Sequence, residues 1–144
     1  MSVSHILKHK GRDVITVLPA ATVKDVADML ASKRIGAVIV STGQGMIDGI
    51  VSERDIVRCI SELGAAALSK PISSIMTPHV QACAEDDSET ELMALMTQHR
   101  IRHLPVVTAG KLSGMISIGD VVKFRIEQIE RDAADMKAYI GGAA

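Results

Sequence analysis

Two short stretches of the sequence carry a hydroxyl and a carboxylate at the same spacing. Both follow the pattern Gly, two apolar residues, Ser, two variable residues and Asp, over residues 49–55 and again over 114–120. Ser followed three residues later by an acid is typical of a helix N-terminus, and the apolar pair is typical of the end of a buried strand. Each copy therefore predicts a strand-to-helix corner that offers backbone N–H groups, a hydroxyl and a carboxylate. Such a corner suits a ribose and a phosphate.

The same Ser–Asp pairs have a second interpretation, the capping box, which needs no ligand. The pairs are Ser52 with Asp55 and Ser117 with Asp120. The glycine three residues before each Ser favours a ligand, because a strand residue without a side chain allows close approach. In the ligand interpretation each Asp accepts hydrogen bonds from both ribose hydroxyls, since a carboxylate only accepts, and each Ser bonds the ribose or a phosphate.

The elements that position these corners occur twice in the 144 residues. The first unit is predicted as a strand at 14–18, a helix from Thr22 to about 34, strands at 37–40 and 46–51, and a helix at 53–63. A second unit follows at an offset of 66, so that Val80 matches Val14, and similar apolar segments at 2–8 and 71–77 precede the two units. An internal repeat of this size predicts an α+β fold of two β-α-β-β-α units. We expect the division at 1–70 and 71–144.

The last predicted helix is longer than its counterpart and could run from about Ile118 to Ile140. Its apolar residues are spaced by 4, 3, 4, 3 and 4, at Val122, Ile126, Ile129, Ala133, Met136 and Ile140. This heptad seam predicts contact with another helix. The alternative is that the helix folds back on its own chain and covers the N-terminal segment.

Composition excludes several classes of function. Hydrophobic residues make up 47% of the chain but aromatic residues only 1%, which leaves no stacking platform for single-stranded nucleic acid. A net charge of −1 argues against nucleic-acid binding by charge. We expect no membrane segment and no signal peptide. Two cysteines without metal-binding spacing, Cys59 and Cys83, indicate reduced thiols and a cytoplasmic protein.

These features together resemble a pair of CBS domains, also called a Bateman module. The resemblance rests on the two corners, on the segment Ile72–Thr77 and on the strand His103–Val107, and it covers nearly the whole chain. It implies two sheets packed about a pseudo-two-fold axis, with two clefts that bind AMP, ADP or ATP, or in some members NAD or S-adenosylmethionine. It also implies a free-standing regulatory module that needs no cofactor, forms a homodimer through its helices and acts on a separate enzyme or transporter.

The resemblance also implies the residues of the site. Arg54, Arg102 and His103 are candidate phosphate ligands, with plain solvent exposure as the alternative. Repeat 1 has Gly36 and Ala37 at the positions of Arg102 and His103, so the two half-sites differ. By family position the adenine contacts are Thr16, Val17 and Ala37 in one site and Ala82, Cys83 and Leu104 in the other, although each also fits an ordinary core.

Two other classes of function remain as rivals. One is an enzyme such as a nucleotide hydrolase, although no catalytic arrangement can be assembled from the sequence. The other is a structural interaction domain with empty clefts. A metal site is not expected, because His5 and His9 lack a third ligand and the helix that contains His99 gives way to a strand before His103.

Overall fold

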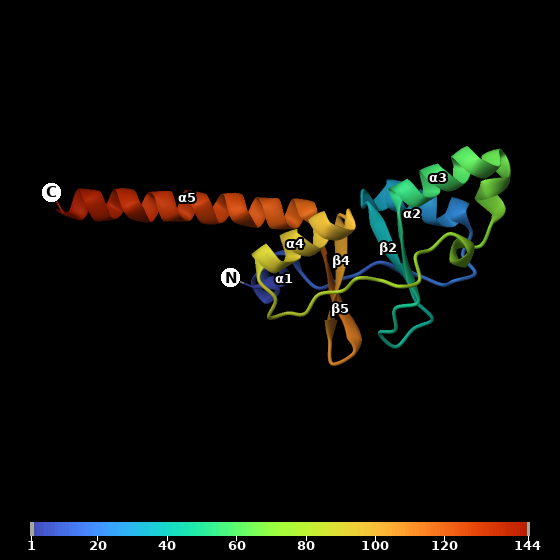
Figure 1. Cartoon of the computed structure of the whole chain (residues 1–144), viewed down its shortest axis with the longest axis horizontal. Coiled ribbons are helices and arrows are strands. Elements are labelled where there is room, and N and C mark those ends of the chain that lie inside the picture. The colour runs from blue at the N-terminus through green and yellow to red at the C-terminus, as the bar shows by residue number, and fades with distance from the viewer. Residues whose placement is uncertain (1, 144) are drawn as a thin grey trace.

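Short apolar runs form the two sheets of the protein, in a computed structural model that describes residues 2–143. Strand β2 (Ala37–Val40) is buried along its whole length and is the central strand of the first sheet. It pairs in parallel with β1 (Thr16–Val17) and antiparallel with β3 (Gly49–Ser52). Strands β4 (His103–Thr108) and β5 (Lys111–Ser117) form the second sheet, which is antiparallel. The two β-α-β-β-α units lie side by side, as predicted (Figure 1).

Three strand predictions were too long. The segment predicted at 14–18 pairs only over Thr16–Val17, and its counterpart near Val80 is reduced to a single parallel bridge between Cys83 and Val106. Residues 46–48 belong to a loop rather than to β3, because the Asp48 carboxylate accepts a hydrogen bond from the Thr42 N–H at 2.6 Å. The Asp48 N–H still donates to the Val40 carbonyl at 2.8 Å, and the pairing with β2 goes no further toward residue 46.

Matching helices begin and end in the same way in both repeats. Helices α2 (Val23–Lys33) and α4 (Glu89–His99) start with reciprocal capping boxes, Thr22 with Asp25 in α2. Both end at an arginine in the left-handed conformation, Arg34 with φ 55° and Arg100 with φ 53°. Helix α3 (Glu53–Leu63) continues into the 3₁₀ helix η1 (Gly64–Ser69). Equivalent capping signals therefore give α2 and α4 the same start and the same end.

Each of the two segments that precede a repeat in the sequence packs in the core of the other repeat. Helix α1 (Val3–Lys10) buries Val3, Ile6 and Leu7 in the core of the second repeat. The 3₁₀ helix η2 (Ile72–Ser74) buries Ile72 in the core of the first. Each core thus contains a segment that precedes the opposite repeat in the sequence, which ties the two halves together. The division of the chain between residues 70 and 71 stays a prediction.

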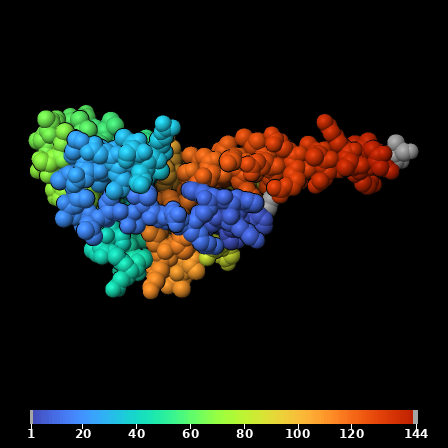
Figure 2. Space-filling view, turned by 180° about the vertical axis from the view of Figure 1, so that it is seen from behind, coloured from blue at the N-terminus to red at the C-terminus, as the bar shows by residue number. Residues whose placement is uncertain are grey.

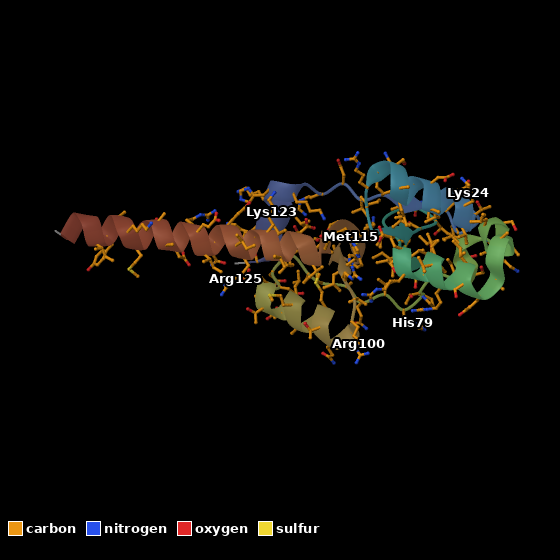
Figure 3. All side chains as sticks on the ribbon, turned by 90° about the horizontal axis from the view of Figure 1, so that it is seen from above. Lys24, His79, Arg100, Met115, Lys123 and Arg125 are labelled. Carbon is orange, nitrogen blue, oxygen red and sulfur yellow. The ribbon has the colours of Figure 1, made fainter. Side chains whose placement is uncertain are left out.

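Helix α5 (Ile118–Ala143) is the longest element, as expected from the sequence. Its base packs on α1 and α4 through Val121 and Phe124, and Figure 3 shows these two helices on opposite sides of it. The rest of α5 projects away from the body (Figures 1 and 2). Only its base contacts α1, so the helix does not fold back over the N-terminal segment. Among residues 2–143, no helix has both the length and the hydrophobicity needed to cross a bilayer.

Candidate functional site

A cleft with a volume of about 380 Å³ opens between the two repeats. This volume lies in the range of roughly 300–1,000 Å³ that is usual for small-molecule sites. Four segments line it: the start of β2, the β3–α3 corner, residues 77–81, and the connection from α4 to β4. Of the predicted site residues it contains Ala37, Ser52, Arg54, Asp55, Arg102 and His103.

The β3–α3 corner has the local geometry that the sequence predicts. The Ser52 backbone N–H donates to Asp55 Oδ2 at 2.8 Å, and the Ser52 hydroxyl donates to the same oxygen at 3.2 Å. Both residues are partly exposed and line the cleft. The corner is therefore a helix cap whose second carboxylate oxygen, Asp55 Oδ1, has no hydrogen-bond partner within residues 2–143.

Arginines dominate the charge of the cleft. Arg54 and Arg58 come from α3, one helical turn apart, and Arg100 and Arg102 come from the end of α4 and the connection to β4. The cleft contains two carboxylates, those of Glu53 and Asp55. Guanidinium groups make strong, geometrically specific hydrogen bonds to phosphate and carboxylate. The cleft can therefore hold an anionic ligand that also offers hydroxyls to Asp55.

His103 lies at the wall between the two corners. A Cβ atom at Gly36 would lie 3.0 Å from Cε1 of His103, so the glycine makes room for the imidazole. Burial, and next the positive charge of Lys10, lower the pKa of His103 below its usual value. The imidazole is therefore neutral near pH 7 and offers one donor and one acceptor rather than a positive charge.

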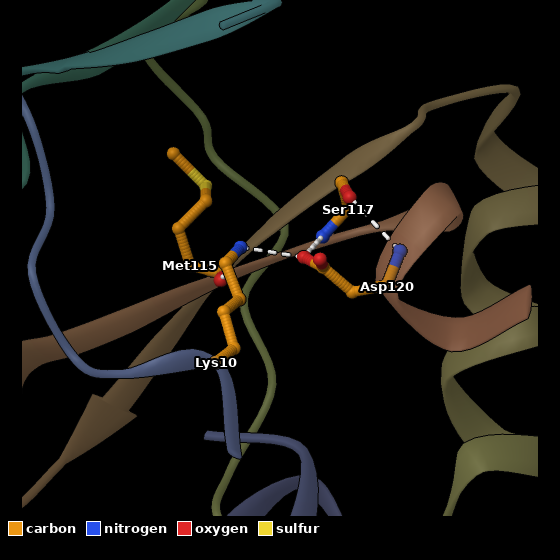
Figure 4. Close-up of polar contacts among 4 residues, drawn as sticks. All are labelled: Lys10, Met115, Ser117 and Asp120. Carbon is orange, nitrogen blue, oxygen red and sulfur yellow. Dashed lines mark hydrogen bonds and ion pairs between the residues drawn. The ribbon is translucent and has the colours of Figure 1, made fainter. Parts of the chain in front are cut away.

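The second corner differs from the first because it already contains a cation. Lys10 Nζ donates to Asp120 Oδ2 at 2.5 Å and to the Met115 carbonyl at 2.6 Å (Figure 4). The Ser117 N–H also donates to Asp120 Oδ2, and the Asp120 N–H donates to the Ser117 hydroxyl. Burial raises the pKa of Asp120, but the bonds from Lys10 and Ser117 outweigh it and leave the pKa below its ordinary value.

The glycines before each Ser do not have the role that the sequence suggested. A Cβ atom at Gly49 would lie 2.6 Å from Met76 Sδ and 2.9 Å from the Thr77 carbonyl, and one at Gly114 would lie 2.8 Å from Leu7 Cδ2. The space above each strand is thus filled by the segment that precedes the opposite repeat. The interpretation that these glycines admit a ligand is wrong, because they admit packing of the protein itself.

The predicted adenine contacts lie mostly outside the cleft. Val17, Cys83 and Leu104 have buried side chains in the two cores, and burial, with the nearby Asp87 charge, raises the pKa of the Cys83 thiol to about 12. Thr16 and Ala82 are exposed at the edges of the sheets, and only Ala37 borders the cleft. Their role in binding adenine stays a prediction.

Several cleft residues were missed in the sequence, among them Arg58, His79, His99 and Arg100. Arg58 could have been predicted as a cleft residue, because it lies one helical turn after Arg54 on the same face of the helix. Figure 3 shows His79 and Arg100 near the junction of the two repeats, where only the tertiary fold brings them. In the described part of the chain, no three His, Cys, Asp or Glu residues are close enough to hold a metal ion.

Two β-α-β-β-α repeats that exchange their leading segments and share a cationic cleft define a tandem-repeat module. The chain belongs to the CBS domain family, which matches residues 3–62 and 72–127. It is 32% identical to the mitochondrial CBS domain-containing protein CBSX3 of Arabidopsis thaliana, over 98% of this chain and 72% of that protein.

Two solved structures have the same fold. A CBS-domain containing protein from Agrobacterium tumefaciens superposes with a TM-score of 0.85 at 43% identity, over 87% of this chain and 99% of that one. A CBS domain protein from Pyrobaculum aerophilum complexed with AMP superposes with a TM-score of 0.74 at 28% identity, over 83% of this chain and 89% of that one.

Proposed function

We propose that this protein is a regulatory module that binds one adenine nucleotide in the cleft beside Asp55 and signals its presence to a separate enzyme or transporter. The observation that carries the proposal is the convergence of four arginines on the Ser52–Asp55 corner. Asp55 would accept hydrogen bonds from the ribose hydroxyls, and the arginines would meet the phosphates. The AMP complex of the Pyrobaculum relative supports an adenine nucleotide as the ligand.

The nucleotide is assigned to the Asp55 cleft rather than to the corner at Asp120. Lys10 donates to Oδ2 of Asp120 from within the chain and occupies space beside the carboxylate. The second corner also has Gly119 where the first has Arg54. It therefore lacks one of the arginines that would meet a phosphate beside Asp55.

The proposal includes no chemical step, and the module is proposed to act in the cytoplasm. Isothermal titration calorimetry against AMP, ADP, ATP, NAD and S-adenosylmethionine tests the ligand. Saturable binding of AMP, ADP or ATP supports the proposal. Exclusive binding of S-adenosylmethionine or NAD would change the ligand class, and binding of none would favour a structural interaction domain.

The alternative function, a nucleotide hydrolase, is tested by a separate experiment. The protein is incubated with ATP and the products are separated by chromatography, with the Asp55→Ala variant in parallel. We expect no turnover above the buffer control. Turnover in the parent that is lost in Asp55→Ala would show that the cleft performs chemistry and would overturn a purely regulatory role.

A further inference from the structure

The outer part of α5 has no neighbour within its own chain. Buried positions on this helix end at Phe124, the half-buried Gln128 follows, and residues 129–142 are all exposed. The large apolar side chains of the predicted seam, from Val122 to Ile140, are between 47% and 63% exposed. A helical extension of this length is marginal alone in water, so an apolar seam along it calls for a partner.

The seam has the period of a coiled coil. Its six residues alternate between d and a positions of a heptad, with Val122, Ile129 and Met136 at d and Ile126, Ala133 and Ile140 at a. The flanking positions are then fixed. The e positions are Lys123, Glu130 and Lys137, and the g positions are Arg125, Asp132 and Tyr139.

The charges at the e and g positions of one helix are complementary to those of a second copy when the two α5 helices run parallel. In a parallel pair each g residue faces the e residue five positions later in the other helix. Asp132 then faces Lys137 of the second copy, and Arg125 faces Glu130 of the second copy. Arg125 also bonds Glu89 of its own chain at 2.8 Å, so the pair of Asp132 and Lys137 carries the clearer signal.

The antiparallel arrangement brings like charges together. When all six seam residues overlap in antiparallel order, Glu130 faces Glu130, Asp132 faces Asp132, and Lys123 faces Lys137. A shift by one heptad in either direction removes these like-charge contacts, with Glu130 opposite Lys137 or opposite Lys123, but each shift leaves two of the six seam residues uncovered. The parallel order covers the whole seam without like charges at these positions, so it is favoured.

We propose that α5 forms a parallel two-stranded coiled coil with α5 of a second copy of this chain. The arrangement buries the whole seam and places both clefts at the same end of the dimer. It goes beyond nucleotide binding and does not depend on it, because every contact lies outside the cleft. Its tests are therefore carried out without nucleotide.

Cross-linking at the far end of the helix tests the orientation. In the parallel pair Ile140 faces Ile140, so Ile140→Cys should give a covalent dimer on mild oxidation. In the full antiparallel overlap these positions are about 27 Å apart, 18 residues along the helix axis. Ala138→Cys, two residues away on the outer face, is the matched control and should stay monomeric on a denaturing gel. The parent is oxidised alongside, since Cys59 and Cys83 are buried.

The opposite cross-linking result would overturn the proposal. A mixture of Val122→Cys and Ile140→Cys chains that cross-links to each other, while Ile140→Cys alone does not, would show an antiparallel pair. Absence of a dimer of the parent in sedimentation equilibrium at high protein concentration would exclude the coiled coil altogether.

Charge and seam variants test the interface itself by sedimentation equilibrium. Asp132→Lys should weaken the dimer about threefold to tenfold, and adding Lys137→Asp should restore it. Asp135→Lys makes the same charge change at a position that is neither e nor g, and it should have little effect on the dimer dissociation constant. Ile129→Asp should give a folded monomer by circular dichroism. A folded Ile129→Asp variant with an unchanged dimer dissociation constant would place the interface elsewhere, for example on exposed Val57 and Ile60 of α3.

Discussion

The Nζ atom of Lys10 lies 2.5 Å from Oδ2 of Asp120, although the two residues are 110 positions apart in the sequence. Lys10 ends α1, the helix that precedes the first repeat but packs in the core of the second. Asp55, the counterpart of Asp120, lines the open cleft, and no lysine or arginine within residues 2–143 is bonded to its carboxylate. One ion pair thus makes the two related corners different in charge and in access.

Removing this cation should change the titration of Asp120. We expect Lys10→Met to raise the pKa of Asp120, because burial then acts with less opposition from hydrogen bonds. The side chains of Lys10 and Asp120 are 34% and 24% exposed, so the free energy of unfolding should fall by no more than about 1 kcal/mol. NMR titration of the Asp120 carboxyl carbon and urea unfolding measure the two effects.

The stability difference between the parent and Lys10→Met should depend on pH in a definite direction. The pKa of Asp120 is lower in the folded protein, so the ion pair stabilises the fold above the unfolded pKa of about 3.9. This stabilisation is lost as the pH falls through the folded pKa. Urea unfolding should show the difference at pH 6 and a smaller one below about pH 4. A difference that stays constant from pH 3 to pH 7 would contradict this assignment.

Asp55 should contribute strongly to nucleotide affinity. Asp55→Asn removes a charged acceptor for the ribose hydroxyls and should weaken AMP binding by about 1.5–3 kcal/mol, roughly tenfold to a hundredfold. Asp25→Asn is the matched control, because Asp25 fills the same capping position in α2 but does not line the cleft. Calorimetry should show a change only for Asp55→Asn. Equal affinities for both variants would leave the corner as a helix cap alone.

The arginines should make the affinity depend on the phosphate. AMP should bind more tightly than adenosine, and its affinity should fall as the salt concentration rises. Arg102→Gln should weaken AMP binding about tenfold and leave adenosine unchanged, because only the phosphate meets the guanidinium. Arg131→Gln on exposed α5 serves as the control. If adenosine binds as tightly as AMP, the arginines do not contact phosphate.

Gly49 should matter for folding rather than for binding. Gly49→Ala places a methyl group against Met76 and the Thr77 carbonyl and should lower the free energy of unfolding by about 1–3 kcal/mol. Gly141→Ala, in an open part of α5, should be neutral or stabilise by up to about 1 kcal/mol. Denaturant unfolding measures both. An unchanged stability of Gly49→Ala would mean that the η2 segment does not pack closely on β3.

The sequence predicted what depends on local spacing. The capping pair at Thr22, the buried run at Ala37–Val40 and the heptad seam of α5 are each fixed by neighbours within a few residues, and each is present in the structure. Arg54, Arg102 and His103, the predicted phosphate ligands, all line one cleft, and their binding of phosphate stays a prediction.

The rest depends on contacts between distant segments. The exchange of α1 and η2 between the cores puts Leu7 over Gly114 and Met76 over Gly49, and no local pattern encodes which core each segment joins. The same exchange brings Lys10 to Asp120. Arg100 ends α4 in the left-handed conformation and lines the cleft, and nothing in its local sequence indicated that it would reach the site.

A titration with AMP followed by amide chemical shifts shows directly whether the nucleotide binds beside Asp55. We expect saturable shifts at residues 52–58 and 100–103, with a stoichiometry of one AMP per chain and only small shifts at residues 117–121. Saturable shifts centred on residues 117–121, or no saturable shifts at millimolar AMP, would contradict the assignment of the nucleotide to the Asp55 cleft.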